Sequence, residues 1–376
     1  MLPTELPTRP EDFSVDILNR IIANNKPDAV LCGFEITENH MWGGGQASSA
    51  GRVIIKPDYV TPAPGLPDHI VIKVAKAAPG TDVDDSKGGG GSPQLYSNEV
   101  NVYTHLRPAE FMETPLCLGG AFDANTTTFC LLLEDLRDRG ATFATIKMPM
   151  TIKRMESIIE ALSSLHARFW NSPEFGKSLG WLESHVEGSL HDLFISDKVR
   201  RFIQHQVDTE QYKEEMVQAL GVTPGQLHEQ FQIAQAHQAT QPRTVCHGDM
   251  HIGNTYVLPG EKAGVLDWQL TSYGHGIHDI SYIMTTGLSV EDRRKHEREL
   301  LSFYRDRLIA KGVKDAPSLD DLWREHRIAM AWNFYIGWLI TPTMNYQWDI
   351  TVMAHLRLMT AYQDLETAKA ISAIRL

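Results

Sequence analysis

Residues 246–268 read CHGDMHIGNTYVLPGEKAGVLDW and combine a polar loop with a short apolar strand. The loop contains Asp249 and, five residues later, Asn254, and the strand Ala263–Leu266 leads directly into Asp267. Mg²⁺ prefers hard oxygen ligands, which a carboxylate and an amide carbonyl supply. A second carboxylate can orient an acceptor hydroxyl and take its proton. The stretch therefore predicts phosphoryl transfer, with Asn254 and Asp267 as metal ligands and Asp249 as the catalytic base.

The order H-G-D-x-H-x-x-N, then an apolar strand and D-W, resembles the aminoglycoside phosphotransferase/choline-kinase-like family. The ecdysteroid-kinase-like branch is a candidate within that resemblance. The family is similar to protein kinases, whose matching pieces are H-R-D-x-x-x-x-N and D-F-G. The resemblance implies a bilobal α+β protein-kinase-like fold, with a small antiparallel β-sheet N-lobe and a larger, mainly helical C-lobe. It also implies ATP and Mg²⁺ as cofactors.

The resemblance implies a lysine on the third strand, which holds the ATP phosphates, and a glutamate on the next helix that pairs with it. Lys73 in HIVIKVA fits the first role, because an unpaired charge inside a buried strand would be costly. Glu99, 26 residues later, fits the second. A surface lysine on an edge strand is the alternative interpretation of Lys73, and Lys56 and Lys76 are weaker candidates.

The segment that joins the lobes is expected at residues 131–136, which read LLLEDL. In the family this segment contacts adenine. The resemblance implies that Glu134 and Asp135 flank this contact through backbone groups, with Leu136 as a further cofactor-binding candidate, and a simple exposed strand end is the alternative.

A phosphate-covering loop is expected between the first two strands, where residues 41–51 read MWGGGQASSAG. Gly44, Gly45 and Ser48 are the candidate contacts, since small residues let backbone N–H groups approach phosphate. The stretch matches neither G-x-G-x-x-G nor G-x-x-x-x-G-K-[ST], which argues against a P-loop NTPase. A plain loop is the alternative.

The pattern predicts an N-terminal extension at 1–29, a nucleotide-binding N-lobe at 30–136, and a helical C-lobe at 137–376 that carries the catalytic loop and the acceptor site. Expected elements are strands at Val30–Thr37, Arg52–Lys56 and His69–Ala75, an apolar run at Phe129–Leu136, and helices at Leu95–Leu106 and Leu322–Ile340. Pro57–Pro67 is expected to be a loop insertion. Thr151 is the expected N-cap of a long amphipathic helix.

Composition excludes several classes of protein. The 376 residues contain 35 Lys and Arg against 47 Asp and Glu, and the net charge of −12 argues against nucleic-acid binding. The four scattered cysteines suit neither a zinc site nor a disulfide framework, so we expect a cytoplasmic protein. The uncharged run Ile328–Thr341 is too short for a membrane span.

No A-P-E segment follows Asp267, so a small-molecule hydroxyl is the expected acceptor rather than a peptide. An aromatic-rich C-terminal region is consistent with a rather apolar alcohol. His166 is expected in the core, and Asp279 as a helix cap or an anchor of the catalytic loop.

Two other functions stay open at this point. A metal-dependent hydrolase could use His247, Asp249 and His251, which alternate along the loop. A kinase-like binding protein without activity is the second alternative.

Overall fold

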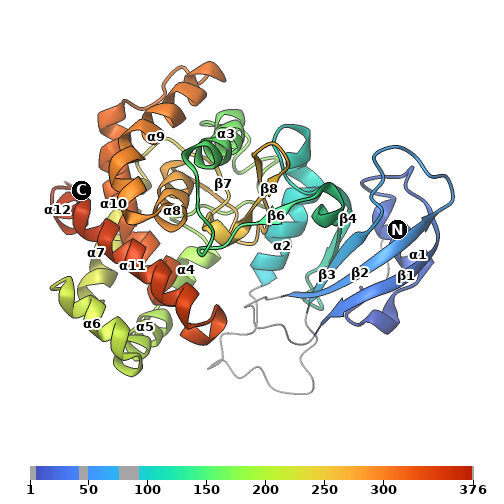
Figure 1. The fold of residues 1–376 in the computed structure, drawn as a ribbon, viewed down its shortest axis with the longest axis horizontal. Coiled ribbons are helices and arrows are strands. Elements are labelled where there is room, and N and C mark those ends of the chain that lie inside the picture. Colours follow the sequence, from blue (N-terminus) through green and yellow to red (C-terminus); the bar gives the residue numbers. More distant parts are fainter. Residues whose placement is uncertain (1–5, 42–49, 76–92, 375–376) are drawn as a thin grey trace. The chain divides into compact units, whose positions relative to one another are not determined.

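The computed structural model describes residues 6–41, 50–75 and 93–374, apart from the side chain of Met344. The chain divides into two compact units. The N-unit comprises Met1–Thr142, Leu258–Gly260 and Gly264–Leu270. The C-unit comprises Phe143–Val257, Glu261–Ala263 and Thr271–Leu376. Figure 1 labels their helices and strands.

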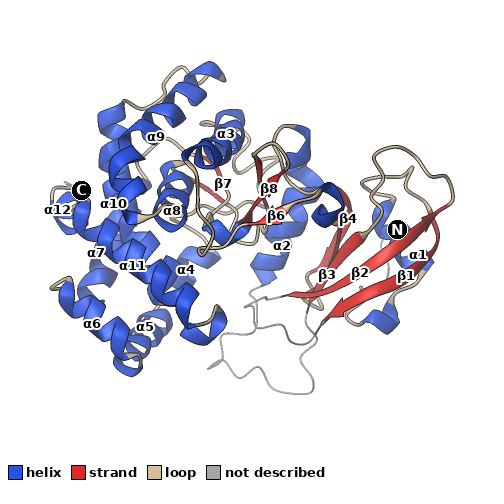
Figure 2. Cartoon of the chain, viewed as in Figure 1, coloured by secondary structure: helices blue, strands red, loops and turns tan. Residues whose placement is uncertain are grey.

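A five-stranded antiparallel sheet is the main feature of the N-unit, in the order β1-β2-β3-β5-β4 (Figure 2). The strands are β1 Leu31–His40, β2 Ala50–Tyr59, β3 Ile70–Ala75, β4 Cys117–Asp123 and β5 Thr128–Glu134. The expected small antiparallel sheet is thus present.

The loop insertion expected from Pro57 begins later than predicted, because β2 continues to Tyr59. Strand β3 pairs with β2 only as far as Ile55, whereas Pro57 still faces Phe34 on β1. A proline lacks the N–H that a second ladder would need, so it is tolerated where the strand has one neighbour.

Helix α1 (Val15–Ile22) contacts β1 and β4 and completes the core of the N-unit. Its buried Leu18, Ile21 and Ile22 belong to one cluster with the buried aliphatic residues of the strands. Gly119 on β4 is required for this packing, since a Cβ there would lie 2.4 Å from the Ile21 carbonyl oxygen. The sheet of the N-unit therefore packs closely against α1.

The helix expected at Leu95–Leu106 consists of two parts. Helix α2 spans Pro93–Asn101, and Val102–Leu106 continue it as a π-helical turn. Helix α2 contacts β4 and β5 and carries the buried Glu99. This packing explains why a glutamate on α2 is directed into the N-unit.

The C-unit is mainly helical. Its helices are α3 Ile152–Arg168, α4 Ser189–Ile195, α5 Asp197–Thr209, α6 Gln211–Ala219, α7 Pro224–Gln238, α8 Ile277–Gly287, α9 Val290–Ala310, α10 Leu319–Phe334, α11 Trp348–Asp364 and α12 Thr367–Ser372. As expected, Thr151 caps α3 by accepting a hydrogen bond from the Arg154 N–H. None of the helices in the described part of the chain has the length and apolar character needed to cross a bilayer.

Short strands β7 (Thr244–Cys246) and β10 (Ser272–Gly274) pair in the C-unit. Strands β6 (Thr142–Phe143), β8 (Thr255–Leu258) and β9 (Lys262–Val265) form a third sheet in the order β6-β8-β9. The expected helix Leu322–Ile340 is again divided, since α10 ends at Phe334 and a π-helix covers Tyr335–Leu339.

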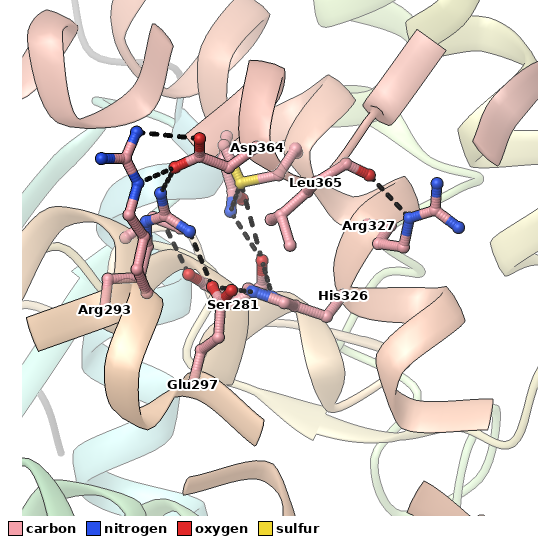
Figure 3. A network of polar contacts seen from close by, with 11 residues as sticks. Ser281, Arg293, Glu297, His326, Arg327, Asp364 and Leu365 are labelled. Atoms are coloured by element: carbon pink, nitrogen blue, oxygen red, sulfur yellow. Dashed lines mark hydrogen bonds and ion pairs between the residues drawn. The ribbon is translucent and has the colours of Figure 1, made fainter. Parts of the chain in front are cut away.

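Helix α8 is buried along its whole length and contacts α3, α9, α10 and α11. A polar network links α8, α9, α10 and α11 (Figure 3). The buried Arg293 on α9 pairs with Glu297 and Asp364, and Ser281 on α8 lies 2.9 Å from Nδ1 of His326. Helix α8 is therefore held in place by its contacts with the other helices of the C-unit.

Lys213 on α6 is a buried lysine that ties α6 to the end of the π-helix and to the chain just after it. Its ammonium donates to the carbonyl oxygens of Leu339 and Thr341, and to the Gln206 side chain. The Glu210 carboxylate lies 3.5 Å away. Burial lowers the pKa of Lys213 to about 8, against the opposing effect of Glu210.

Candidate active site

Lys73, Glu99 and Asp267 meet inside the N-unit. The Lys73 ammonium on β3 donates to both carboxylate oxygens of Glu99, at 2.6 and 2.7 Å. It also lies 3.7 Å from Oδ1 of Asp267. Burial alone would lower the pKa of Lys73, but the carboxylates of Asp267 and Glu99 outweigh it and raise that pKa. The structure thus pairs the two residues that the sequence pattern proposed, and it keeps the lysine charged.

Asp267 adopts a backbone conformation that is rare for residues other than glycine. Its φ is +68°, in the left-handed region. Its Oδ1 atom is buried and has no hydrogen-bond partner among the described residues. A buried carboxylate oxygen without a donor is a chemical fit for a hard cation such as Mg²⁺. The predicted metal-ligand role of Asp267 is therefore compatible with its surroundings.

The segment around Asp267 is held by partners from distant parts of the N-unit. Asn98 on α2 donates to the Gln269 carbonyl at 3.0 Å, and the Thr114 hydroxyl donates to the Val265 carbonyl at 3.0 Å. The Val265 N–H donates to the carbonyl of Glu113 at 3.2 Å. These bonds fix the backbone on both sides of Asp267.

The expected adenine segment runs from the end of β5 into a 3-10 helix at Leu136–Arg139. The Glu134 side chain accepts hydrogen bonds from the Leu116 N–H and from Arg139. Leu136 is buried. The side chain of Glu134 is therefore engaged within the N-unit, and the contact of this segment with adenine stays a prediction. Gly44, Gly45 and Ser48 lie outside the described residues.

Asp249 and Asn254 meet inside the C-unit. The Asn254 amide donates to the Asp249 carbonyl oxygen at 2.8 Å and to its carboxylate at 3.2 Å. The His251 N–H donates to the same carbonyl at 2.8 Å. Since these bonds use the amide nitrogen of Asn254, its carbonyl oxygen can serve a cation. The Asp249 side chain is 29% exposed, so a substrate can reach it.

Asp279 on α8 anchors this loop. Its carboxylate accepts the N–H groups of His247 and Gly248, at 2.6 and 2.9 Å. His166 Nε2 lies 3.2 Å from the same carboxylate, and the Tyr304 hydroxyl lies 2.8 Å from His166 Nδ1. Burial would raise the pKa of Asp279, but the hydrogen bond from His166 and the neighbouring imidazoles lower it to about 2. Of the two roles expected for Asp279, the structure favours the anchor, and His166 is a core residue as expected.

The metal-hydrolase alternative finds little support in this geometry. In the described part of the chain, the ligand atoms that cluster closely enough for a metal belong to His166, Cys246 and Asp279, not to His247, Asp249 and His251. Hydrogen bonds already engage His166 and Asp279, and burial raises the pKa of Cys246 well above its usual value. This cluster is therefore a packed anchor of the loop.

Aromatic rings surround the second histidine of the loop. The ring centroid of His251 lies 6.1 Å from those of Trp338 and Tyr346, which are 5.4 Å from each other. His251 Nε2 also lies 3.8 Å from the Asp249 carboxylate. We call His251, Trp338 and Tyr346 the aromatic wall. A cluster of aromatic rings thus adjoins the candidate base.

Comparison with known proteins now identifies the family. A model of the ecdysteroid kinase-like family matches residues 74–314. The chain belongs to this family. A search of curated protein sequences found no match.

Solved structures show which fold the ecdysteroid kinase-like chain adopts. It is similar to choline kinase from Cryptosporidium parvum, with 12% identity, a TM-score of 0.52, and coverage of 89% of each chain. It is also similar to an ethanolamine kinase from Plasmodium vivax, with 11% identity, a TM-score of 0.51, and coverage of 89% of this chain and 84% of that one. The predicted protein-kinase-like α+β fold is confirmed.

Sequence reasoning missed several residues that position the site of this ecdysteroid kinase-like protein. Asn98 and Thr114 bond a segment more than 150 positions away, and no local pattern marks them. His278 contacts the catalytic loop through Gly248. Its place beside Asp279 in HDISY was the one available signal.

Proposed function

We propose that this protein is an ATP-dependent phosphotransferase that transfers the γ-phosphate to a hydroxyl group of a small molecule. The observation that carries the proposal is the buried, charged Lys73, held by Glu99 beside Asp267. A protein core tolerates such a charge cluster when its members are paired, and clusters of this kind mark functional sites. Membership of a kinase-like family supports the same conclusion.

The residues of the N-unit take the nucleotide. Lys73 would bind the α- and β-phosphates, and Glu99 would keep its ammonium in place. Backbone groups of Glu134 and Leu136 would contact adenine. We retain residues 30–136 as the nucleotide-binding lobe and residues 137–376 as the lobe with the acceptor site.

Mg²⁺ would be held by Asn254 and Asp267, and when bound it neutralises the charge that develops on the phosphates. Asp249 orients the acceptor hydroxyl and accepts its proton. The hydrogen bonds to the Asp249 backbone hold its position, while the partial exposure of its side chain leaves the carboxylate accessible.

The acceptor is proposed to be a small alcohol whose apolar part packs against the aromatic wall. Trp338 is buried, and its ring contacts both other members of the wall. A polycationic acceptor such as an aminoglycoside would instead require a row of carboxylates. All four cysteines are unpaired, which supports a reducing, cytoplasmic environment.

ADP release tests the proposal. Sugars, choline, aminoglycosides and hydroxylated lipids are supplied with Mg²⁺ and ATP, and at least one hydroxylated compound is expected to stimulate ADP release. Asp249→Asn should lower turnover by about 10²- to 10⁴-fold, the usual contribution of general base catalysis, and leave ATP affinity nearly unchanged.

Asp320→Asn is the matched control, because Asp320 is an exposed carboxylate on α10. Turnover of Asp249→Asn at the wild-type rate would remove Asp249 from the base role. Binding of ATP without transfer to any acceptor would favour the kinase-like binding protein.

A further inference from the structure

The peptide group between Gly248 and Asp249 is held at both ends by histidine side chains. His278 Nε2 lies 2.9 Å from the Gly248 carbonyl oxygen. The Asp249 N–H donates to His247 Nδ1 over 3.3 Å. Because a carbonyl oxygen can only accept, the proton of this bond must be on His278 Nε2. A peptide group is planar, so bonds at its two ends fix its tilt.

The tilt of this peptide group is one of the constraints on where the Asp249 side chain points, beside the bonds that Asn254 and His251 donate to Asp249. Gly248 has a φ of +86°, and glycine by itself imposes little on the backbone. Asp279 accepts the N–H groups of His247 and Gly248, but it makes no bond to the peptide group that follows. Rotation of that group would turn the Cα–Cβ bond of Asp249 without breaking any bond to Asp279.

The His278 ring lies in the core, where its neighbours restrict both its position and its tautomer. It is 1% exposed, and its ring centroid lies 4.1 Å from that of His185 and 4.5 Å from that of Trp332. His278 Nδ1 and His185 Nε2 are buried without hydrogen-bond partners in the described part of the chain. A proton on Nδ1 would thus place an unsatisfied donor in the core, which is costly.

The charged and titratable neighbours of His278 include Asp279, Asp249, His166, His185 and Tyr282. Burial lowers the pKa of His278 against the opposing charges of the two carboxylates, and it lowers that of His185 well below the usual value. Both rings are therefore neutral at neutral pH. The environment of His278 thus selects the tautomer that its bond to Gly248 requires.

We propose that His278 is a positioning residue, whose Nε2–H sets the orientation of the Gly248–Asp249 peptide group and so aims the Asp249 carboxylate. This inference rests on the proposed function, in which Asp249 receives the proton of the acceptor hydroxyl. Within the described part of the chain, the rings of His185 and Trp332 pack against this imidazole without a hydrogen bond to the loop.

The tautomer can be measured without any acceptor. In the full-length protein labelled with ¹⁵N-histidine, the His278 ring is expected to be neutral with its proton on Nε2 at neutral pH. His278→Phe identifies its signals by their loss. An imidazolium, or a neutral ring with the proton on Nδ1, would overturn the proposal.

Three variants test the positioning role. His278→Phe removes the donor and keeps a ring, His278→Gln restores an N–H donor at the same distance from the backbone, and His185→Phe is the matched control. Amide hydrogen exchange across residues 246–250 should accelerate about fivefold to tenfold in His278→Phe, the effect of one lost hydrogen bond. It should remain near the wild-type rate in His185→Phe.

Turnover measurements distinguish a specific effect of His278 on the orientation of Asp249 from a general loss of packing in the core. With Mg²⁺, ATP and the hydroxylated compound that the acceptor screen identifies, kcat of His278→Phe should fall about 10- to 100-fold, with the KM for ATP unchanged. His278→Gln should recover most of this loss. Equal losses in His278→Phe and His185→Phe, or no rescue by His278→Gln, would overturn the proposal. A wild-type protein that releases no ADP would instead contradict the proposed function, and the tautomer and the exchange rates would still decide whether His278 holds the loop.

Discussion

Lys73 in the N-unit and Lys213 in the C-unit are both buried, yet their pKa values move in opposite directions. Burial disfavours the charge of each. For Lys73, the carboxylates of Asp267 and Glu99 outweigh burial and raise the pKa. Lys213 instead donates to an amide and to two backbone carbonyl oxygens, with Glu210 3.5 Å away, and its pKa falls to about 8.

The difference between the two pKa shifts follows from the partners of each lysine and indicates the role of each. Neutral oxygens satisfy the hydrogen bonds of an ammonium group, but they do not repay the cost of removing its charge from water. Lys73 stays charged because two carboxylates accompany it, which suits the phosphate-binding role that we propose for it. Lys213 has a single carboxylate nearby, that of Glu210, which does not outweigh burial. It acts as a cross-link from α6 to the end of the π-helix and to Thr341.

The largest expected effect comes from breaking the pair in the N-unit. Lys73→Met leaves Glu99 and Asp267 as uncompensated charges and should lower the free energy of unfolding by about 3–5 kcal/mol. Urea denaturation measures this loss, and calorimetric titration with Mg²⁺–ATP should show a loss of affinity as well.

A double variant separates the two losses. Lys73→Met with Glu99→Gln removes both charges of the pair, so it should recover part of the stability and none of the ATP affinity. Recovery of ATP affinity would contradict the assignment of Lys73 to the phosphates.

The pH dependence of Lys213 sharpens the comparison. Its folded-state pKa of about 8 lies below the usual 10.5, so the unfolded state binds more protons between these values. The free energy of unfolding should therefore rise as the pH increases through this window, by about 3 kcal/mol at most. Urea denaturation of the wild type and of Lys213→Met isolates the effect as a difference in slope. Parallel curves for the two proteins would show that Lys213 keeps an ordinary pKa.

Asp279 extends the comparison to a buried anion, whose pKa is lowered, against the effect of burial, by the hydrogen bond from His166 and by the neighbouring imidazoles. Its pKa of about 2 lies below the usual 3.8, so its stabilising contribution is complete above pH 3.8 and is lost as the pH falls through 2. The contribution should be about 2 kcal/mol. Acid denaturation of Asp279→Asn should show a correspondingly weaker pH dependence than that of the wild type. An unchanged acid transition would contradict this account.

The smallest expected effect concerns the ion pair of Arg154 and Glu261, which is partly exposed to solvent. Arg154 lies 2.6 Å from Glu261 in the C-unit, and both side chains are partly exposed. A double-mutant cycle with Arg154→Ala and Glu261→Ala should give a coupling energy of about 0.2–1 kcal/mol, which added salt should reduce. A coupling energy as large as the loss in Lys73→Met would mean that burial is not what makes the Lys73 pair costly to break.

Patterns in the sequence predicted the parts of the site whose chemistry leaves a local trace. A lysine inside an apolar strand and a carboxylate directly after one are both conspicuous, and together with the family resemblance they made Lys73 and Asp267 candidates. Asp279 was also identified as a possible anchor. These residues stand out because their charge conflicts with their surroundings.

Other parts depended on contacts that no local pattern encodes. The bond from Asn98 to the Gln269 carbonyl joins residues 171 positions apart. The continuation of β2 through Pro57 follows from where β3 stops pairing. The π-helix at Tyr335–Leu339 interrupts a run that reads as one helix, because helical periodicity alone does not reveal how the last turns are wound. The roles of individual site residues stay predictions until the variants are measured.

The left-handed backbone at Asp267 has an evolutionary consequence. Asparagine and glycine adopt this conformation more readily than other residues, and a single base change converts an aspartate codon into a codon for either. A mutation can therefore remove this carboxylate with little strain on the backbone that carries it. Related chains that keep the fold but have lost phosphoryl transfer should arise easily, and asparagine or glycine at this position would be their mark.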